Sequence, residues 1–174
     1  MNEEETVAIK NSRTGVWQMR ARLDEQCIIQ ANSQFWEQML AMRLDPTLSP
    51  GVFCLGPGHI VASVDLSGNW KGRVEVRLAV SLAYQATAAM MMQPVQTVVE
   101  ADALDAAKEI ANMIAGTIKS SLPRPCSMAV PESAVVSARF CGHRRTEDTL
   151  AVAFRHAAGD LMVQVWEEEC LQDL

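Results

Sequence analysis

Four stretches with the pattern of a strand follow one another in the C-terminal part of the chain, and no helical pattern separates them. Apolar residues alternate with other residues, or run on, over 126–130, 133–141, 149–156 and 161–166. Pro, Gly or charged turn residues bound each stretch. Adjacent strands without intervening helices disfavour a doubly wound parallel sheet. The chain is therefore predicted to fold around a mostly antiparallel sheet.

A hairpin and three helical segments complete the predicted architecture. Strands 59–66 and 73–80 flank the turn-rich segment 67–72. Helical spacing extends over 14–43, as one long helix or as two helices broken near Leu23 and Asp24, and again over 81–93 and 102–122. The expected fold class is α/β of the α+β type: a two-layer sandwich of about six strands and about three helices, two of them long.

Length and composition indicate a single globular domain over residues 1–174, with 1–13 flexible or accessory. Hydrophobic residues make up 49% of the chain and charged residues 21%, which is inside the globular range. The net charge of −6 argues against nucleic acid as a partner, because phosphate binding needs a concentrated basic face. Neither a secretory signal nor a membrane-spanning stretch is recognised, so we expect no membrane partner and a cytoplasmic location.

The sulfur-containing residues are interpreted as packing residues. The cysteines are scattered, odd in number and never in C-x-x-C spacing, which predicts reduced thiols packed as small apolar groups and no metal site. They are Cys27, Cys54, Cys126, Cys141 and Cys170. The methionines at 90–92 are expected to fill gaps in the core rather than to line a contact surface.

The segment 102–122 carries a polar stripe on one face of its predicted helix. Because a helix advances about 100° per residue, Asp105, Glu109, Asn112 and Gly116 fall within roughly 60° of one another. The opposite face is apolar and should dock on the core. Long charged residues usually cover the solvent side of such a helix, whereas short polar groups and a glycine suit close approach by another macromolecule's backbone.

Two segments together resemble one family of signalling phosphatases. Residues 109–116 read EIANMIAG, preceded by Asp105 and followed by Lys119, and this run resembles the signature helix of the CheC/CheX/FliY phosphatases, CheX in particular. Residues 64–76 read VDLSGNWKGRVEV and are similar to that family's glycine hairpin. The similarity covers roughly residues 23–167 and implies a single CheX-like domain that forms a homodimer.

The resemblance also implies an activity and its residues. Members of the family hydrolyse the aspartyl phosphate of CheY-like response regulators. Carried over by position, Glu109 would pair with a lysine of the regulator and Asn112 would orient the attacking water. Asp105 and Gly116 would contribute to binding, and Pro131 is the candidate for a proline that follows the asparagine in the family pattern.

The chemistry is consistent with this assignment. Phosphoryl hydrolysis calls mainly for an in-line water and stabilised charge, and a carboxamide both accepts from water and donates to a phosphoryl oxygen. The phosphorylated receiver would supply Mg²⁺, so no cofactor or metal of the chain's own is expected. His59, His143 and His156 have no pairing with an acid and are interpreted as structural or surface residues. No G-x-S-x-G turn or P-loop is present.

A second hypothesis is a non-catalytic module that docks a receiver domain or a flagellar-switch component through the same helix. Ser33 and Glu37 on the first helix repeat the spacing of Asp105 and Glu109, but Leu40 stands where an asparagine would be needed, so a second site is missing. For the homodimer, an exposed strand such as 133–141 is expected to pair edge to edge with a second copy.

Overall fold

The computed structural model describes residues 9–10, 17–18, 23–47, 52–143, 145–146 and 149–168. Most of the predicted flexible or accessory segment 1–13 lies outside this range. The helices are α1 (Glu25–Leu40), α2 (Val80–Met91), the 3-10 turn η1 (Val95–Thr97) and α3 (Glu100–Ser120). The strands are β1 (Ile9–Lys10), β2 (Trp17–Gln18), β3 (Asp45–Thr47), β4 (Val52–Leu55), β5 (His59–Gly68), β6 (Gly72–Leu78), β7 (Cys126–Met128), β8 (Glu132–Val136), β9 (Phe140–His143), β10 (Arg145–Thr146), β11 (Thr149–Arg155) and β12 (Leu161–Glu167).

An eight-stranded sheet with antiparallel pairing throughout forms the centre of the molecule. Its order is β10-β11-β12-β6-β5-β7, with β3 pairing with β11 and β8 pairing with β5. Two smaller pairs, β1 with β2 and β4 with β9, are not hydrogen-bonded into this sheet. The predicted fold class, an α/β sandwich with three helices and a mostly antiparallel sheet, is confirmed.

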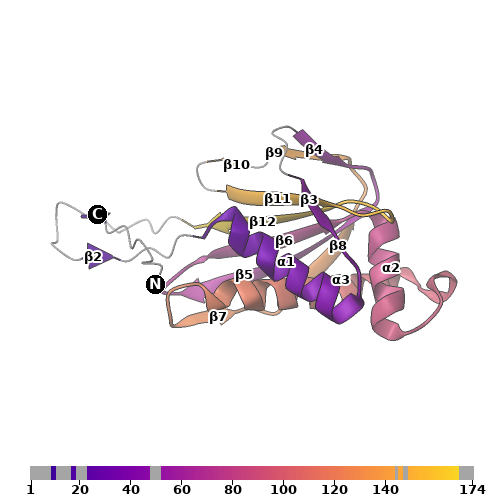
Figure 1. Cartoon of the computed structure of the whole chain (residues 1–174), viewed down its shortest axis with the longest axis horizontal. Helices are drawn as coiled ribbons and strands as arrows, with labels where there is room; N and C mark the ends of the chain where they lie inside the picture. The colour runs from indigo at the N-terminus through magenta and orange to yellow at the C-terminus, as the bar shows by residue number, and fades with distance from the viewer. Residues whose placement is uncertain are drawn as a thin grey trace.

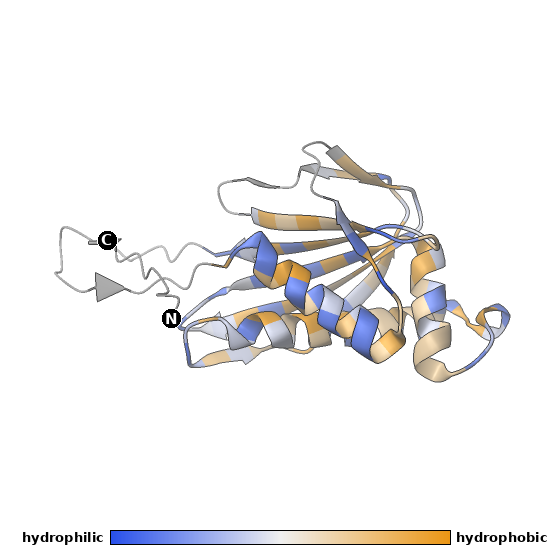
Figure 2. Cartoon of the chain, viewed as in Figure 1, coloured by the Kyte–Doolittle hydropathy of each residue, from blue (hydrophilic) through white to orange (hydrophobic). Residues whose placement is uncertain are grey.

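The three helices cover one face of the sheet, so the domain has two layers (Figure 1). Alternation along the strands explains this arrangement: Val74, Val76 and Leu78 of β6 are fully buried against the helices, while the residues between them face the other way. The same alternation appears as stripes of opposite hydropathy along the strands in Figure 2. None of the described helices is both long and apolar enough to cross a bilayer.

The predicted hairpin is confirmed as β5 and β6. Gly68 ends β5 where the turn begins. Its φ of +124° lies in the region that favours glycine, and a Cβ there would clash with the Pro125 carbonyl. Beside the turn, the guanidinium of Arg73 donates to both carboxylate oxygens of Asp65, at 2.6 and 3.0 Å. This cross-strand pair lowers the pKa of the Asp65 carboxyl, mainly through the hydrogen bonds from Arg73.

A single helix over residues 14–43 is a wrong prediction. The helix α1 begins only after Asp24, whose carboxylate accepts from the Cys27 backbone N–H at 2.8 Å and so caps the helix. Upstream, Trp17 and Gln18 form a strand, and the other residues of 14–22 lie outside the described range. The alternative, two helices broken near Leu23 and Asp24, is correct for the second helix, α1, and wrong at Trp17 and Gln18, which form a strand. The cap is the physical reason that the apolar spacing does not continue as one helix.

The strand predicted over residues 133–141 is two strands that belong to different sheets. Residues 133–141 divide between β8, which pairs with β5, and β9, which pairs with β4. The two are separated by the residues at 137–139. Alternation of residue type along a sequence does not distinguish one sheet from another.

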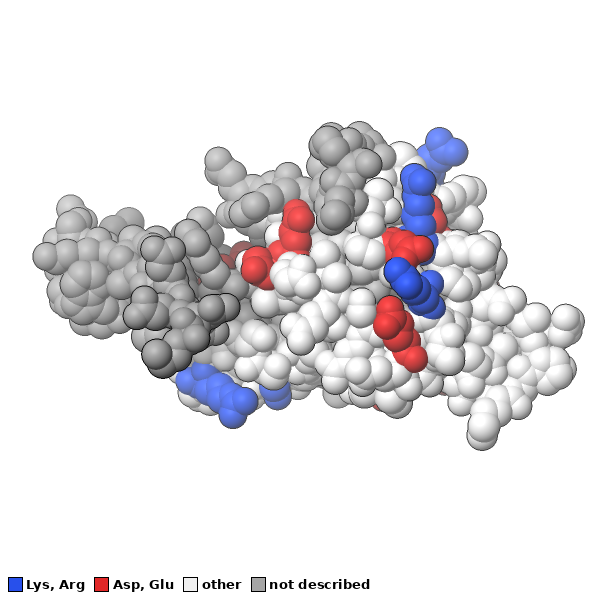
Figure 3. Space-filling view, viewed as in Figure 1, with Lys and Arg blue, Asp and Glu red and all other residues white. Residues whose placement is uncertain are grey.

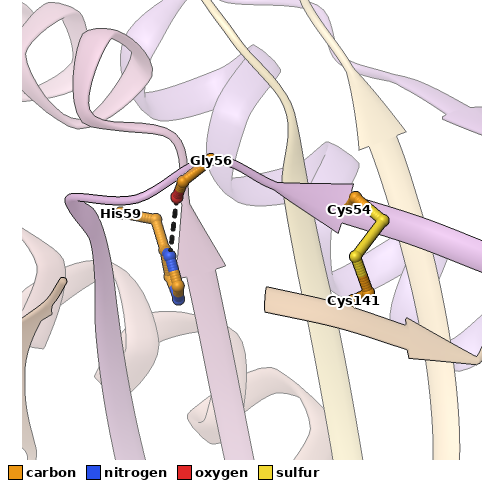
Figure 4. Close-up of a disulfide and its surroundings, with 4 residues drawn as sticks. All are labelled: Cys54, Gly56, His59 and Cys141. Atoms are coloured by element: carbon orange, nitrogen blue, oxygen red, sulfur yellow. Dashed lines mark hydrogen bonds between the residues drawn. A yellow bond between two sulfur atoms is a disulfide. The ribbon is translucent and has the colours of Figure 1, made fainter. Parts of the chain in front are cut away.

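The prediction that all described cysteines are reduced is also wrong. Cys54 and Cys141 lie directly opposite each other in the β4–β9 pair and form a disulfide, which Figure 4 shows. The pairing of the strands brings together two thiols that lie 87 residues apart in the sequence. Cys27 and Cys126 are free, and the thiol of Cys170 lies outside the described residues.

The methionines after α2 do not all fill the core. Met90 packs against it, but Met91 is 49% exposed and Met92 is 93% exposed. They belong to a segment, 79–99, that contains no charged residue. In Figure 3 the end of the molecule formed by α2 is accordingly free of Lys, Arg, Asp and Glu. The core-filling prediction is therefore wrong for Met91 and Met92.

Candidate functional site

The helix α3 displays the predicted polar stripe on its outer surface. Eight residues bury its opposite face against the sheet and the other helices: Ala103, Ala106, Ala107, Ile110, Ala111, Ile114, Ala115 and Ile118. Acidic residues occupy the first turn and Lys119 the last, which suits the helix dipole at both ends. Because the buried face is fixed by this apolar surface, the direction of the stripe is fixed as well.

All four predicted site residues lie on this outer surface. Asp105 and Glu109 are exposed, and Asn112 and Gly116 are half-buried. Helix geometry puts Glu109 and Asn112 one turn apart, so an acid and an amide project from neighbouring positions. No hydrogen bond or ion pair joins either side chain to another residue in the described part of the chain. Both groups are therefore available to a molecule that approaches α3 from solvent.

Asp105 is held by a neighbour on the same helix. The Lys108 ammonium donates to its Oδ1 at 2.7 Å, an i, i+3 pair in which the Asp105 side chain remains 75% exposed. Asp105 and Lys108 have the i, i+3 spacing of an ion pair in the sequence, but the predicted stripe did not include Lys108. The ion pair partly neutralises the acidic end of the stripe.

Gly116 is not required by the packing of this chain. A Cβ added at its position would meet only the sulfur of Met128, at an ordinary contact distance of 4.0 Å. Glycine inside a helix costs about 1 kcal/mol relative to alanine. No neighbour within the described chain requires a residue without a side chain at this position. The glycine therefore fits a surface that another molecule approaches closely.

The segment that follows α3 runs back along the stripe. Met128 at the end of β7 lies beside Gly116, and the Ser133 hydroxyl of β8 donates to the Leu104 carbonyl of α3 at 2.9 Å. Pro131 lies between these two contacts and directly precedes β8. The segment therefore forms one border of the outer surface of α3. The periodicity of the sequence could not predict that this segment packs beside α3.

A second polar cluster occupies the face of the sheet away from the helices. The Arg77 guanidinium pairs with the Glu75 carboxylate at 2.6 Å and stacks on the Phe140 ring at 4.1 Å. Burial raises the pKa of Glu75, and the charge of Arg77 partly offsets that rise. The cluster joins β6 to the disulfide-linked strand β9 and has a structural role.

The described histidines have structural surroundings. The Nδ1–H of the buried His59 donates to the Gly56 carbonyl at 3.0 Å, as Figure 4 shows, and its Nε2 accepts from Arg77 at 3.2 Å. His156 accepts from the Ala158 backbone N–H at 3.0 Å. The side chain of His143 lies outside the described residues. Across the described ranges, no group of His, Cys, Asp and Glu is arranged to hold a metal ion.

Comparison with known proteins connects this helix to one family. A family model described as chemotaxis phosphatase CheX matches residues 60–154, which include β5 from its second residue and all of β6 and α3. No match to the chain was found among curated protein sequences.

Three solved structures show the same fold. The chemotaxis protein CheX from Vibrio vulnificus has a TM-score of 0.68 and 16% identity, over 85% of this chain and 98% of that one. The CheX–CheY–BeF3–Mg complex from Borrelia burgdorferi has a TM-score of 0.63 and 15% identity, over 85% and 100%. FliY from Thermotoga maritima has a TM-score of 0.55 and 14% identity, over 80% and 84%. At these identities the similarity concerns the fold.

Proposed function

We propose that this chain, which belongs to the CheX family of chemotaxis phosphatases, hydrolyses the aspartyl phosphate of a CheY-like receiver domain. One observation carries the proposal: Glu109 and Asn112 project one turn apart from the outer surface of α3, and neither side chain forms a hydrogen bond or ion pair with another described residue. The complex formed by the Borrelia burgdorferi protein, which shares the fold, supports a CheY-like receiver as the partner.

Asn112 is the residue suited to guide the water. Its amide oxygen accepts a hydrogen bond from the attacking water, and its amide nitrogen donates to a phosphoryl oxygen. Both contacts favour an in-line attack, which is the main requirement of phosphoryl hydrolysis. An acyl phosphate is labile, so the helper has to supply only a few kcal/mol, at about 1.4 kcal/mol for each tenfold in rate.

Glu109 is suited to bind a cation on the partner. A carboxylate close to a phosphoryl group repels it unless a positive charge lies between them. The receiver provides two such charges in this proposal, a lysine that pairs with Glu109 and the Mg²⁺ bound beside the phosphoaspartate. The chain then needs no metal of its own. Asp105, paired with Lys108, adds to the rim of the docking surface.

The proposal includes a homodimer that acts in the cytoplasm. The strand β8 pairs with β5 on one side, and its other edge pairs with no strand among the described residues. Val135 of β8 is 38% exposed. An antiparallel pairing of β8 with the β8 of a second copy would satisfy this open edge.

The decay of a phosphorylated receiver tests the catalytic proposal. The wild-type chain should shorten the phosphoryl lifetime of at least one receiver from its own organism, measured by loss of radiolabelled phosphate. Asn112→Ala should lower that acceleration by about 100-fold, as expected for removal of one positioned polar group at a transition state. Gln85→Ala on α2, a polar residue on another helix, serves as the matched control and should retain the wild-type rate.

The same experiment separates the phosphatase from the non-catalytic module. A wild-type chain that binds a receiver and leaves its phosphoryl lifetime unchanged would contradict the phosphatase proposal and support docking alone. In that case Asn112→Ala should bind the receiver as the wild type does.

A further inference from the structure

Eight large hydrophobic side chains are exposed among the described residues, and one of them belongs to α3. They are Met39, Val80, Met91, Met92, Val99, Met113, Val130 and Val135. Met113 is 38% exposed, in contrast to Ile110 and Ile114 of the same helix, which are fully buried. Met113 therefore contributes less to the core than its helical neighbours, and its apolar surface faces solvent.

Helix geometry places Met113 inside the candidate site. It follows Asn112 directly, lies four residues after Glu109 and precedes Gly116 by three. Residues three and four apart are neighbours on a helix surface, so Met113 touches the same small area as Glu109 and Gly116. A domain that brings a reacting group to Glu109 and Asn112 has to cover Met113 as well.

We infer that Met113 is a specificity-determining residue, which inserts against an apolar side chain next to the phosphorylated aspartate of the docked receiver. This inference rests on the proposed function, because it takes the receiver as the partner that covers α3. Exposed apolar groups inside a polar rim are the usual energetic centre of an interface. On α3 the polar side chains next to Met113 are Glu109, four residues before it, the adjacent Asn112, and Thr117, four residues after it.

The side chain also fits a partner surface of variable shape. Methionine is unbranched and polarisable, so it adapts to different apolar neighbours. Receivers that present an apolar residue opposite Met113 should bind well, whereas receivers with a charged residue there would have to desolvate it without a partner. Met113 thus selects among receivers, while Glu109 and Asn112 act on the phosphoryl group that all phosphorylated receivers share.

The test separates binding from hydrolysis. Binding is titrated with receivers that carry beryllofluoride and Mg²⁺, a stable mimic of the phosphorylated form, and hydrolysis is followed at saturating chain in single turnovers. Met113→Ala should raise the Kd by about 10-fold, equivalent to about 1.4 kcal/mol, and leave the saturated rate within about twofold of wild type. Met113→Leu should restore the affinity, and Met113→Lys should weaken it further.

A matched control uses Met92, which at 93% is the most exposed large hydrophobic residue in the described part of the chain and lies at the end of α2. Met92→Ala should bind the receiver with wild-type affinity. Thermal unfolding of each variant checks that the fold is intact, since a lower affinity must not come from loss of structure.

The outcomes distinguish this inference from the proposed function. If the wild type hydrolyses a receiver's phosphate and Met113→Ala binds that receiver with unchanged Kd, the inference is wrong and the phosphatase stands. If the wild type binds without hydrolysis and Met113→Ala weakens binding, the phosphatase is wrong and the inference stands. If no receiver binds the wild type, both are wrong.

Discussion

A few residues determine the chemical character of the outer surface of α3. Periodicity predicts that Asp105, Glu109, Asn112 and Gly116 share one face, and the described structure places all four on the outer surface. The same periodicity puts Met113 beside Glu109, although its hydrophobicity alone would assign it to the core, and the structure leaves it 38% exposed.

At this scale Gly116 offers a variant whose effects on stability and binding should oppose each other. Gly116→Ala should raise the free energy of unfolding by about 0.5–1 kcal/mol in urea, because alanine favours the helix and its Cβ meets only Met128 at 4.0 Å. The same methyl group should weaken binding of a beryllofluoride-loaded receiver, because it fills space that the partner approaches.

Gly56 provides the control for this substitution. It lies before β5, and a Cβ there would meet no atom within 4 Å. Gly56→Ala should leave receiver binding unchanged. An unchanged affinity in Gly116→Ala as well would remove Gly116 from the docking surface.

At the scale of elements, the order of helices and strands was predictable and the partners of some strands were not. Turn residues delimit the hairpin β5–β6, and apolar spacing delimits α2 and α3 within about two residues of the expected bounds. By contrast, the assignment of β8 and β9 to different sheets depends on contacts remote in sequence. The same is true of the disulfide, because Cys54 and Cys141 meet only through the register of β4 and β9.

The disulfide leads to a prediction about stability. A double variant, Cys54→Ser with Cys141→Ser, should unfold in urea with a free energy about 2–4 kcal/mol lower than the oxidised wild type, because a link that closes a long loop restricts the unfolded chain. Wild type in excess dithiothreitol should behave like the double variant. Cys27→Ser removes a free thiol and should match the oxidised wild type. Five free thiols in the purified, non-reduced chain would contradict the disulfide.

At the scale of the whole molecule, one layer of helices lies on an antiparallel sheet, and two different elements carry the proposed receiver-docking surface and the proposed dimer interface. The docking surface belongs to α3, and the open edge belongs to β8, which the Ser133–Leu104 hydrogen bond holds next to α3. The two-layer architecture was predictable from the succession of strands and helices. The strand order was not, because it depends on which antiparallel partners pack best.

The proposed dimer is a prediction about assembly. Light scattering of the wild type at micromolar concentration should give a mass near twice 19.1 kDa. Val135→Lys should give a monomer, because a charged residue on an edge strand opposes pairing with a second edge. Met92→Lys, on the surface beyond α2, should remain a dimer. A monomeric wild type under these conditions would rule out the proposed β8 interface.

The most direct test of the account is a multiple-turnover measurement. One receiver is phosphorylated and freed of its kinase, and this chain is added at about one molecule per hundred receivers. The account predicts that the whole population loses its phosphate faster than it does without the chain, since Glu109 and Asn112 act on each receiver in turn. A population that decays at its spontaneous rate, for every receiver of the organism, would contradict it.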